Sequence, residues 1–455
     1  MPANGKEYKL LIKIAGAIDK TFGASLSAAE NEIKKSSIKI DDEFKRLDKG
    51  FNKIAGVGKK AFNAVVTSAE LAAVAVGGIL IAATKVGSEF ETAFAGVKKT
   101  VDATNDEFDT LRENILEMSG YLPSSAKEIA NVMEIAGQLG IKTDSLTDFT
   151  ETMINLGVST NMSAEDAATA LAKFANITQM TDFDSQGLSN WDKLGSVVVD
   201  LGNNFATTEE DIVNMSLKLA SMGRIVGLSE SQIMGLATAM SSVGIKTEAG
   251  GSTMSKLLKK MNSAVNKQGI ALSEYATVAG MTSGEFTELF RSDAAQAVLA
   301  FVKGLNDTDR NGKDAAMILE DMDIKEVRLT NTILALAGAY EVLGDSLSTA
   351  DQAWNDSTAL SEEAAKRYET VDSQIQILKN NLSLAGIAIY DEIRDPLVDT
   401  IHGMTNVVKK IQPQSIEDIS IASALFRPGP QANIPVYIKN KKNPDKIEYI
   451  DDRLK

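Results

Sequence analysis

Residues 207–261 read TTEEDIVNMSLKLASMGRIVGLSESQIMGLATAMSSVGIKTEAGGSTMSKLLKKM, and this stretch decides the fold class. A capping box of Thr207 and Glu210 is expected to begin one helix, and Ser229 with Gln232 is expected to begin the next. Apolar residues then recur at helical steps, namely Ile212, Met215, Leu219 and Met222, followed by Ile233, Leu236, Ala237 and Met240. The spacing therefore predicts consecutive amphipathic helices.

Glycines are expected to end these helices. Gly227 and Gly244 can adopt the left-handed conformation, and aliphatic Leu228 and Ile245 follow them to cover the last turn. A third helix is expected from about Gly251 to Met261.

The composition extends this prediction to the whole chain. Of 455 residues, only Pro123 is a proline between Pro2 and Pro396, and aromatic residues make up 5%. Few prolines and few aromatic residues favour helix over sheet. We therefore expect an all-α, elongated multi-helix array with an N-terminal coiled coil and short extended segments at both termini.

Four segments carry a resemblance to a known family. They are GIKTEAGGSTMSKLLKKM in residues 244–261, FETAFAGVKKTVDATNDEFDTLRENILEMSGYLPSSAKEIANVMEIAGQLGI in 90–141, GEFTELFRSDAAQAVLAFVKGL in 284–305 and RYETVDSQIQILKNNL in 367–382. In this order they resemble the core region of the phage tail tape measure proteins, in which an EAGG step precedes a short amphipathic helix. The resemblance covers roughly residues 85–385.

The resemblance implies a structural role and no catalysis. A protein of this family lies in the lumen of the virion tail, sets the length of the tail tube during assembly in the host cytoplasm, and leaves through the tube when DNA is ejected. The implied partners are a few copies of the chain itself, the tail tube protein, tail assembly chaperones and baseplate or tail-tip proteins. No cofactor is implied.

The charged residues and the missing cysteines exclude several other classes of protein. The net charge of −15 argues against a nucleic-acid binder that works by phosphate neutralisation, and no sequence-specific nucleic-acid partner is expected. The charge is uneven, because residues 1–63 carry 13 Lys and Arg against 8 Asp and Glu. No cysteine is present, and His402 is the single histidine. These counts exclude thiolate chemistry and a histidine-rich metal cluster, and His402 is expected to be a capping or exposed residue. We therefore expect no catalytic, cofactor-binding or metal-binding residues.

Four regions are expected along the chain. They are an N-terminal strand and arm in 1–25, a coiled coil and apolar helix in 26–86, the helical core in 87–390 and a proline-broken tail in 391–455. The strand is YKLLIKI, residues 8–14, which alternates in period two. The heptad positions are Ile33, Ile40, Phe44, Leu47, Phe51, Ile54, Ala61 and Val65. This pattern predicts either self-association of a few copies or an amphipathic helix packed on its own chain.

The most apolar run is Leu71–Thr84, LAAVAVGGILIAAT. Its 14 residues fall short of the roughly 20 that span a bilayer, so a buried helix is expected. The alternative function is a membrane-active helical protein that inserts this segment after oligomerisation.

An internal duplication is expected in the core. A shift of 87 residues superposes Gly140 on Gly227, Phe149 on Leu236, Met153 on Met240, Gly157 on Gly244, Leu171 on Leu258 and Phe174 on Met261. The first copy would begin at Ser124 or Ser125 and have helix stops at Gly140 and Gly157. This spacing predicts a repeated three-helix unit.

The remaining segments are expected as follows. Residues 175–206, with Trp191, are a looser connection, and helices cover Ser283–Leu305, Lys313–Leu347 and Ser361–Ile389. After Pro396 the prolines end helical structure, and IPVYIKNKKNPDKIEYI is extended.

Three motifs resemble ligand sites, and each departs from its pattern. Gly244–Thr253 has five residues between Gly244 and Gly250 instead of the four of a phosphate-binding loop, so a flexible helix start is expected. Asp307, Asp309, Asn311 and Gly312 match half of a calcium loop, but Ile318 stands where its bidentate Glu belongs. GVGKKA, residues 56–61, follows no strand. An ordinary turn or helix explains each of them.

Overall fold

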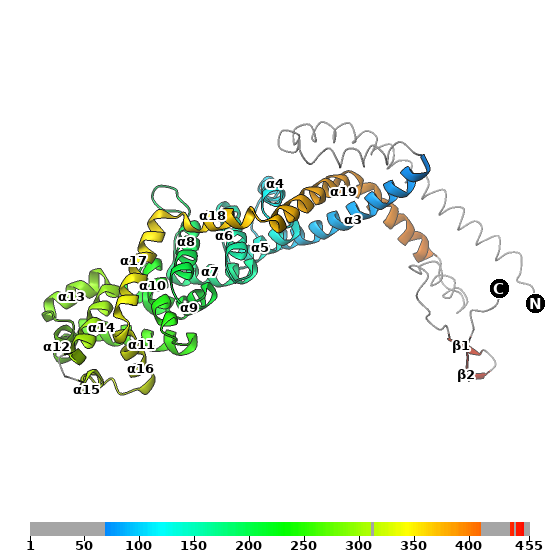
Figure 1. Ribbon diagram of the computed structural model, residues 1–455. Coiled ribbons are helices and arrows are strands. Elements are labelled where there is room, and N and C mark those ends of the chain that lie inside the picture. The colour runs from blue at the N-terminus through cyan, green and yellow to red at the C-terminus, as the bar shows by residue number, and fades with distance from the viewer. Residues whose placement is uncertain (1–68, 311–313, 411–436, 441–442, 450–455) are drawn as a thin grey trace, which may run out of the picture. The chain divides into compact units, whose positions relative to one another are not determined.

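The computed structural model describes residues 69–310, 314–410, 437–440 and 443–449. The predicted N-terminal strand, the heptad segment and GVGKKA lie outside these residues. Within them the structure is helical apart from one short β-hairpin, so the predicted all-α class is confirmed (Figure 1).

The helices follow one another with short connections. In chain order they are α3 (Ala69–Thr100), α4 (Asn105–Tyr121), α5 (Ala126–Gln138), the 3₁₀ turn η1 (Thr143–Ser145), α6 (Leu146–Ser159), α7 (Ala164–Thr178), α8 (Asn190–Asn204), α9 (Glu209–Val226), α10 (Glu230–Ser242), α11 (Thr247–Lys267), α12 (Ile270–Val278), α13 (Ser283–Ser292), α14 (Ala294–Arg310), α15 (Ala315–Asp321), α16 (Val327–Gly338), α17 (Tyr340–Asp356), α18 (Ala359–Tyr368) and α19 (Val371–Lys410). The strands β1 (Tyr437–Asn440) and β2 (Asn443–Tyr449) pair antiparallel, which confirms the predicted extended segments there.

The chain divides into two compact units. One is Ala64–Tyr390, and the other combines Met1–Asn63 with Asp391–Lys455. In the first unit the helices form a row in which neighbours in space, often not consecutive in the chain, pack on one another. Examples are α3 on α5, α5 on α6, α7 on α9, α9 on α11, α10 on α17 and α14 on α16. One continuous helix, α3, passes through the expected region boundary at residue 87, and α19 passes from one unit into the other.

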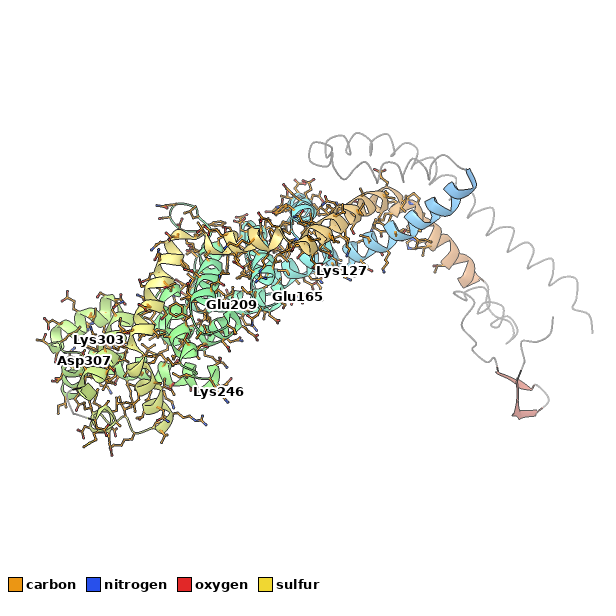
Figure 2. The ribbon with its side chains drawn as sticks, in the orientation of Figure 1. Lys127, Glu165, Glu209, Lys246, Lys303 and Asp307 are labelled. Carbon is orange, nitrogen blue, oxygen red and sulfur yellow. The ribbon has the colours of Figure 1, made fainter. Side chains whose placement is uncertain are left out.

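A continuous core runs through this row. Its largest fully buried side chains include Trp191, Phe149, Phe174, Phe286 and Phe301. Charged side chains lie on the outside of the helices (Figure 2). Lys127 on α5, for example, lies 3.4 Å from Glu89 on α3, with both side chains exposed.

The predicted helix starts are confirmed in one case and wrong by one residue in the other. Ser229 and Gln232 form a capping box, in which each side chain accepts a hydrogen bond from the other residue's amide. The N-cap of α9 is Thr208, whose hydroxyl accepts from the Asp211 amide, and not Thr207. The Thr207 hydroxyl instead donates to Ser241 Oγ on α10 at 2.6 Å, so this residue joins two helices.

The EAGG step is a helix crossing and not a flexible helix start. The third helix, α11, begins at Thr247 and not near Gly251, and both glycines are buried within it. A Cβ atom at Gly250 would lie 2.8 Å from Met215 Sδ, and one at Gly251 would lie 2.3 Å from Lys218 Cβ. Glycine therefore lets α11 approach α9 closely, and this explains the motif without a ligand.

The expectation of a loose connection in residues 175–206 is wrong. Residues 190–204 form α8, and Trp191 is 1% exposed with its ring 4.7 Å from that of Phe149 in an edge-on contact. Glycines within α8 obscured its helical pattern. One of them, Gly195, is needed because a Cβ there would lie 2.6 Å from Leu360 on α18.

The two expected repeat copies differ at one of their helix stops. Gly140 and Gly227 both have a left-handed backbone, with φ of 83° and 82°. Gly157 lies inside α6 against the Ala164 backbone, whereas Gly244 has φ of 79°, so the predicted stop at Gly157 is wrong. The other four matched pairs are all fully buried, and Ser125 caps α5 with Glu128.

The predicted long helix Ser361–Ile389 is two helices, because Glu369 and Thr370 are not helical and separate α18 from α19. Helix α19 continues beyond the predicted end at Ile389 to Lys410, and Pro396 lies inside this helix. It is exposed, so water can satisfy the carbonyl that a proline leaves without its helical partner. Further breaks separate α13 from α14 and divide 315–356 into α15, α16 and α17.

Candidate functional site

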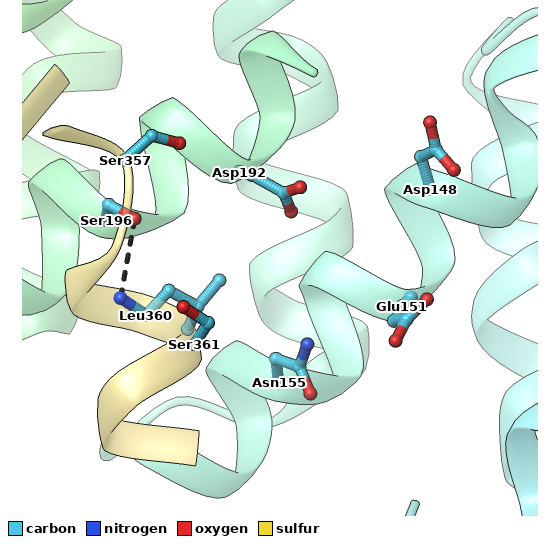
Figure 3. Close-up of a pocket in the computed structure, with 8 residues that line it drawn as sticks. All are labelled: Asp148, Glu151, Asn155, Asp192, Ser196, Ser357, Leu360 and Ser361. Carbon is cyan, nitrogen blue, oxygen red and sulfur yellow. Dashed lines mark hydrogen bonds between the residues drawn. The ribbon is translucent and has the colours of Figure 1, made fainter. Parts of the chain in front are cut away.

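A polar cleft lies between α6, α8 and the connection from α17 to α18 (Figure 3). It holds about 260 Å³ and is lined by Asp148, Glu151, Asn155, Asp192, Ser196, Ser357, Leu360 and Ser361. We refer to these eight residues as the acidic cleft. The cleft was not predicted from the sequence, because its residues come from three segments. The third segment, 357–361, lies more than 150 positions after the other two.

Three carboxyl groups give the acidic cleft its charge. Asp148 and Glu151 lie one turn apart on α6, and Asp192 faces them from α8. Burial raises the pKa of Asp148, and the nearby Asp192 charge raises it further. Burial also raises the pKa of Glu151, although a hydrogen bond with Tyr121 opposes this shift. The fold thus holds like charges together in a partly desolvated place.

Hydrogen bonds fix the walls of the acidic cleft. The Thr152 hydroxyl donates to Asp192 Oδ1 at 2.5 Å, and the Tyr368 hydroxyl donates to Asn155. The Leu360 amide donates to Ser196 Oγ at 3.4 Å, which anchors the start of α18. Burial and the Glu151 charge raise the pKa of Tyr368. In the described part of the chain no Lys or Arg forms an ion pair with Asp148, Glu151 or Asp192.

The chemistry of the acidic cleft is that of a hydrogen-bonded helix junction. A serine nucleophile needs a base within hydrogen-bond reach, and Ser196 accepts from a backbone amide instead. The only histidine, His402, is exposed on α19 and belongs to the other unit. The unit that contains the acidic cleft therefore offers Ser196 no histidine of its own as a base.

We expect Asp148→Asn and Glu151→Gln to stabilise the protein at neutral pH, each by about 1 kcal/mol or less, because the groups are partly solvated. Their folded pKa values exceed the ordinary 3.8 and 4.5, so the folded chain binds protons more tightly than the unfolded chain. Stability should therefore fall as pH rises through this window, and the substitutions should flatten that fall. Urea unfolding at several values between pH 4 and pH 7 measures the free energy of unfolding of each variant and its dependence on pH.

Asp184 provides a control of opposite sign. A hydrogen bond from Lys193, with Nζ 2.5 Å from Oδ2, lowers the pKa of Asp184 to about 2. Its contribution to stability is present above pH 3.8 and is lost as pH falls towards 2. Asp184→Asn should destabilise the protein at neutral pH, and a stabilising effect there would contradict the electrostatic account of both sites.

The motifs that resembled ligand sites do not form them in the described residues. Gly250 and Gly251 lie inside α11, and α14 continues as a helix through Asp307 to Arg310, where a calcium loop would need a turn. Among the described residues no three His, Cys, Asp or Glu side chains are grouped so as to hold a metal ion. The described helices, α3 included, are each too short or too polar to cross a membrane.

The described residues of the unit Ala64–Tyr390 form an all-α array of helices that meet through closely packed glycines. Comparison with known families identifies it more closely: residues 112–361 match the model of the phage-related minor tail proteins. This match covers more than half of the chain, and the chain therefore belongs to that family. The family match supports a structural role in a phage tail.

A second match begins after the first ends. Residues 400–455 match the finger domain of the bacterial DNA polymerase III alpha subunit. This part of the chain is 51% identical over 47 residues to the DNA polymerase III subunit alpha of Ureaplasma parvum, and 40% identical over 52 residues to that of Staphylococcus aureus. These alignments cover 10% and 11% of this chain but only 5% of each polymerase subunit. No solved structure matches the chain significantly.

The polymerase-like segment explains the change in composition after Pro396. The prolines in RPGPQANIPVYIKNKKNPDK predict a tail without helices. The same segment is similar to the finger domain of the bacterial DNA polymerase III alpha subunit. The first match ends within α18 and the second begins within α19, after the division of the compact units at Tyr390.

Proposed function

We propose that this chain is the tail tape measure protein of a phage or phage-tail-like particle. It sets the length of the tail tube during assembly and leaves through the tube when DNA is ejected. The match of residues 112–361 to the minor tail family carries the proposal. The row of helices supports the proposal, because a row can contact other tail proteins along its length. The function of such a protein would depend on the length of its chain.

Contour length is the physical basis of the ruler. A helix rises about 1.5 Å per residue, so the whole chain laid out as one helix would reach at most roughly 680 Å. Helices folded against one another contribute much less than this. The ruler role therefore requires the helix contacts in Ala64–Tyr390 to open when the chain is laid along the tube.

The structure offers places for that opening. Short connections separate the helices, and polar groups such as the acidic cleft lie between α6, α8 and α18. Like charges at a helix junction weaken it relative to an apolar one. We propose that these junctions open first, while the capped helices remain intact.

The proposed partners follow from the same role. They are a few further copies of the chain, the tail tube protein, tail assembly chaperones and baseplate or tail-tip proteins, and the proposed place in the virion is the tail lumen. The excess of basic residues in 1–63 suits an acidic partner surface. Electron microscopy of tails assembled with in-frame length variants tests the ruler.

The match of residues 400–455 favours a second function for this segment alone. These residues carry nine Lys and Arg against six Asp and Glu, whereas the chain as a whole has a net charge of −15. We propose that the segment contacts nucleic acid through phosphate groups, without base recognition and without polymerase activity. The proposal rests on the polymerase likeness and on this local charge.

We expect the full chain to bind labelled DNA at low salt and to lose this binding when Lys439 and Lys446 of the hairpin are both changed to Gln. The slope of log affinity against log salt should fall by about one for each lysine that contacts phosphate. Lys256→Gln with Lys259→Gln, on exposed positions of α11, is the matched control and should leave binding unchanged. Equal losses from both pairs of substitutions, or no binding at any salt concentration, would exclude the proposal.

A further inference from the structure

One face of α19 is apolar over its first five turns, and three of its six side chains are exposed while the other three are half-buried. Its residues follow alternating steps of four and three and are Val371, Ile375, Leu378, Leu382, Ala385 and Ile389. We call these six residues the α19 stripe. Val371 is 76% exposed, Ile375 46% and Leu382 64%. Large aliphatic side chains at such spacing are the pattern of a coiled-coil seam.

The opposite face of α19 is held in place, so the stripe cannot turn inward. The Asn380 side chain donates to the carbonyl oxygens of Leu122 at 3.1 Å and Ser124 at 2.8 Å. The Asn381 side chain donates to the carbonyl of Gly120 at 3.0 Å. These bonds join α19 to the end of α4 and the following loop. They fix the rotation of the helix and leave the α19 stripe outward.

Contacts with α3 reinforce this orientation. Ile387 and Tyr390 are buried, and a Cβ at Gly87 of α3 would lie 2.1 Å from the Tyr390 ring. The Tyr390 hydroxyl donates to Glu91 at 2.5 Å. The described residues of the same unit thus pack on one side of α19 and leave Val371, Ile375 and Leu382 on the other side exposed.

We propose that a second copy of this chain covers the α19 stripe, with the two α19 helices parallel and in register. A seam with three-and-four spacing is best filled by a helix of the same spacing. The exposed flanking positions also favour a copy, since Gln374 and Ala388 are uncharged and Asp372 and Lys379 are opposite in charge. Copies of an acidic chain repel one another elsewhere, and here they meet without net charge.

The parallel direction rests on the proposed function, because copies laid along one tube point the same way. The contact itself does not depend on that function. A failure of the α19 contact and a failure of the ruler can be told apart, since the first is measured on the purified chain and the second on assembled tails.

The chain has no cysteine, so single cysteines report the contact directly. Leu382→Cys places one thiol at the centre of the seam, where two parallel copies bring it within the Cα separation of about 4.4–6.8 Å that a disulfide needs. The full-length variant should oxidise to a covalent dimer at least about tenfold faster than Ile270→Cys. Ile270 on α12 is the matched control, because it is 80% exposed and lies outside the stripe.

A charge in the seam provides the second test. Ile375→Asp with Leu382→Asp should lower the copy number measured by sedimentation while the helical circular dichroism signal is unchanged, and Ile270→Asp should alter neither. Equal oxidation rates for the two cysteine variants would overturn the proposal. It would also be overturned by a monomer whose Leu382→Cys thiol resists a soluble thiol reagent, because the chain's own segment would then cover the stripe.

Discussion

Replacing Trp191 with Ala is expected to lower the free energy of unfolding by about 3–5 kcal/mol, the range for removing a large aromatic side chain from a core. Trp191 is the largest fully buried side chain and packs edge-on against Phe149, itself 0% exposed. Its removal leaves a cavity at the junction of α6 and α8. Urea unfolding followed by circular dichroism measures the change.

The second tryptophan of the chain is the control. Trp354 on α17 is partly exposed and packs at the edge of the core, so Trp354→Ala should cost clearly less. In the double variant Trp191→Ala with Phe149→Ala, the two losses should not add, because the residues share one contact. Equal losses for Trp191→Ala and Trp354→Ala would show that α8 is not a core helix.

Gly304→Ala is expected to be the most disruptive single-methyl change, with a loss of about 3 kcal/mol or more, at the upper end of the overpacking range. A Cβ at Gly304 of α14 would lie 1.7 Å from the carbonyl oxygen of Val278, at the end of α12. That atom is backbone and cannot move aside by a change of rotamer. Helix α12 would have to shift away from α14.

Gly338→Ala separates this clash from the intrinsic preference of helices for alanine. Gly338 ends α16, and a Cβ there meets nothing within 4 Å. The substitution should leave stability unchanged or raise it by up to about 1 kcal/mol. If both glycine variants behaved alike in thermal unfolding, the close approach of α12 to α14 would be wrong.

Local signals in the sequence predicted much of the fold. The capping box at Ser229, the left-handed glycines Gly140 and Gly227 and the extended segments after residue 436 are all present. Each is a short-range effect, since a cap or a glycine turn depends on residues within one helical turn. The shift of Thr207 to Thr208 occurred because two neighbouring threonines have the same local signal.

The features that could not be predicted from the sequence depend on contacts between helices that are distant in the chain. Gly195, Gly250 and Gly251 look like helix breakers along the chain, yet each lies where a neighbouring helix approaches too closely for a Cβ. The acidic cleft was missed for a related reason. Asp148, Asp192 and Ser361 are ordinary helix-surface residues until α6, α8 and α18 meet. The expectation that no residues form a catalytic or metal site stays a prediction.

The polymerase-like segment was missed for a different reason. The composition shows that the chain becomes rich in proline after Pro396, but composition alone does not show to which family a segment is related. Prolines that break a helix also occur in the loops of folded domains. Helix α19 is continuous across residues 391–410. A helix can therefore enter a segment that is related to a different protein family from the segment before it.

Tail length measured by electron microscopy tests the ruler most directly. Deletion of residues 141–227 removes 87 residues, the shift that superposes Gly140 on Gly227, and joins Gly140 to Leu228 with the helix stop preserved. The account predicts tails shorter by up to about 130 Å, from a rise of about 1.5 Å per residue, and tails longer by a similar amount when the same 87 residues are duplicated. Tails of unchanged length in both variants would contradict it.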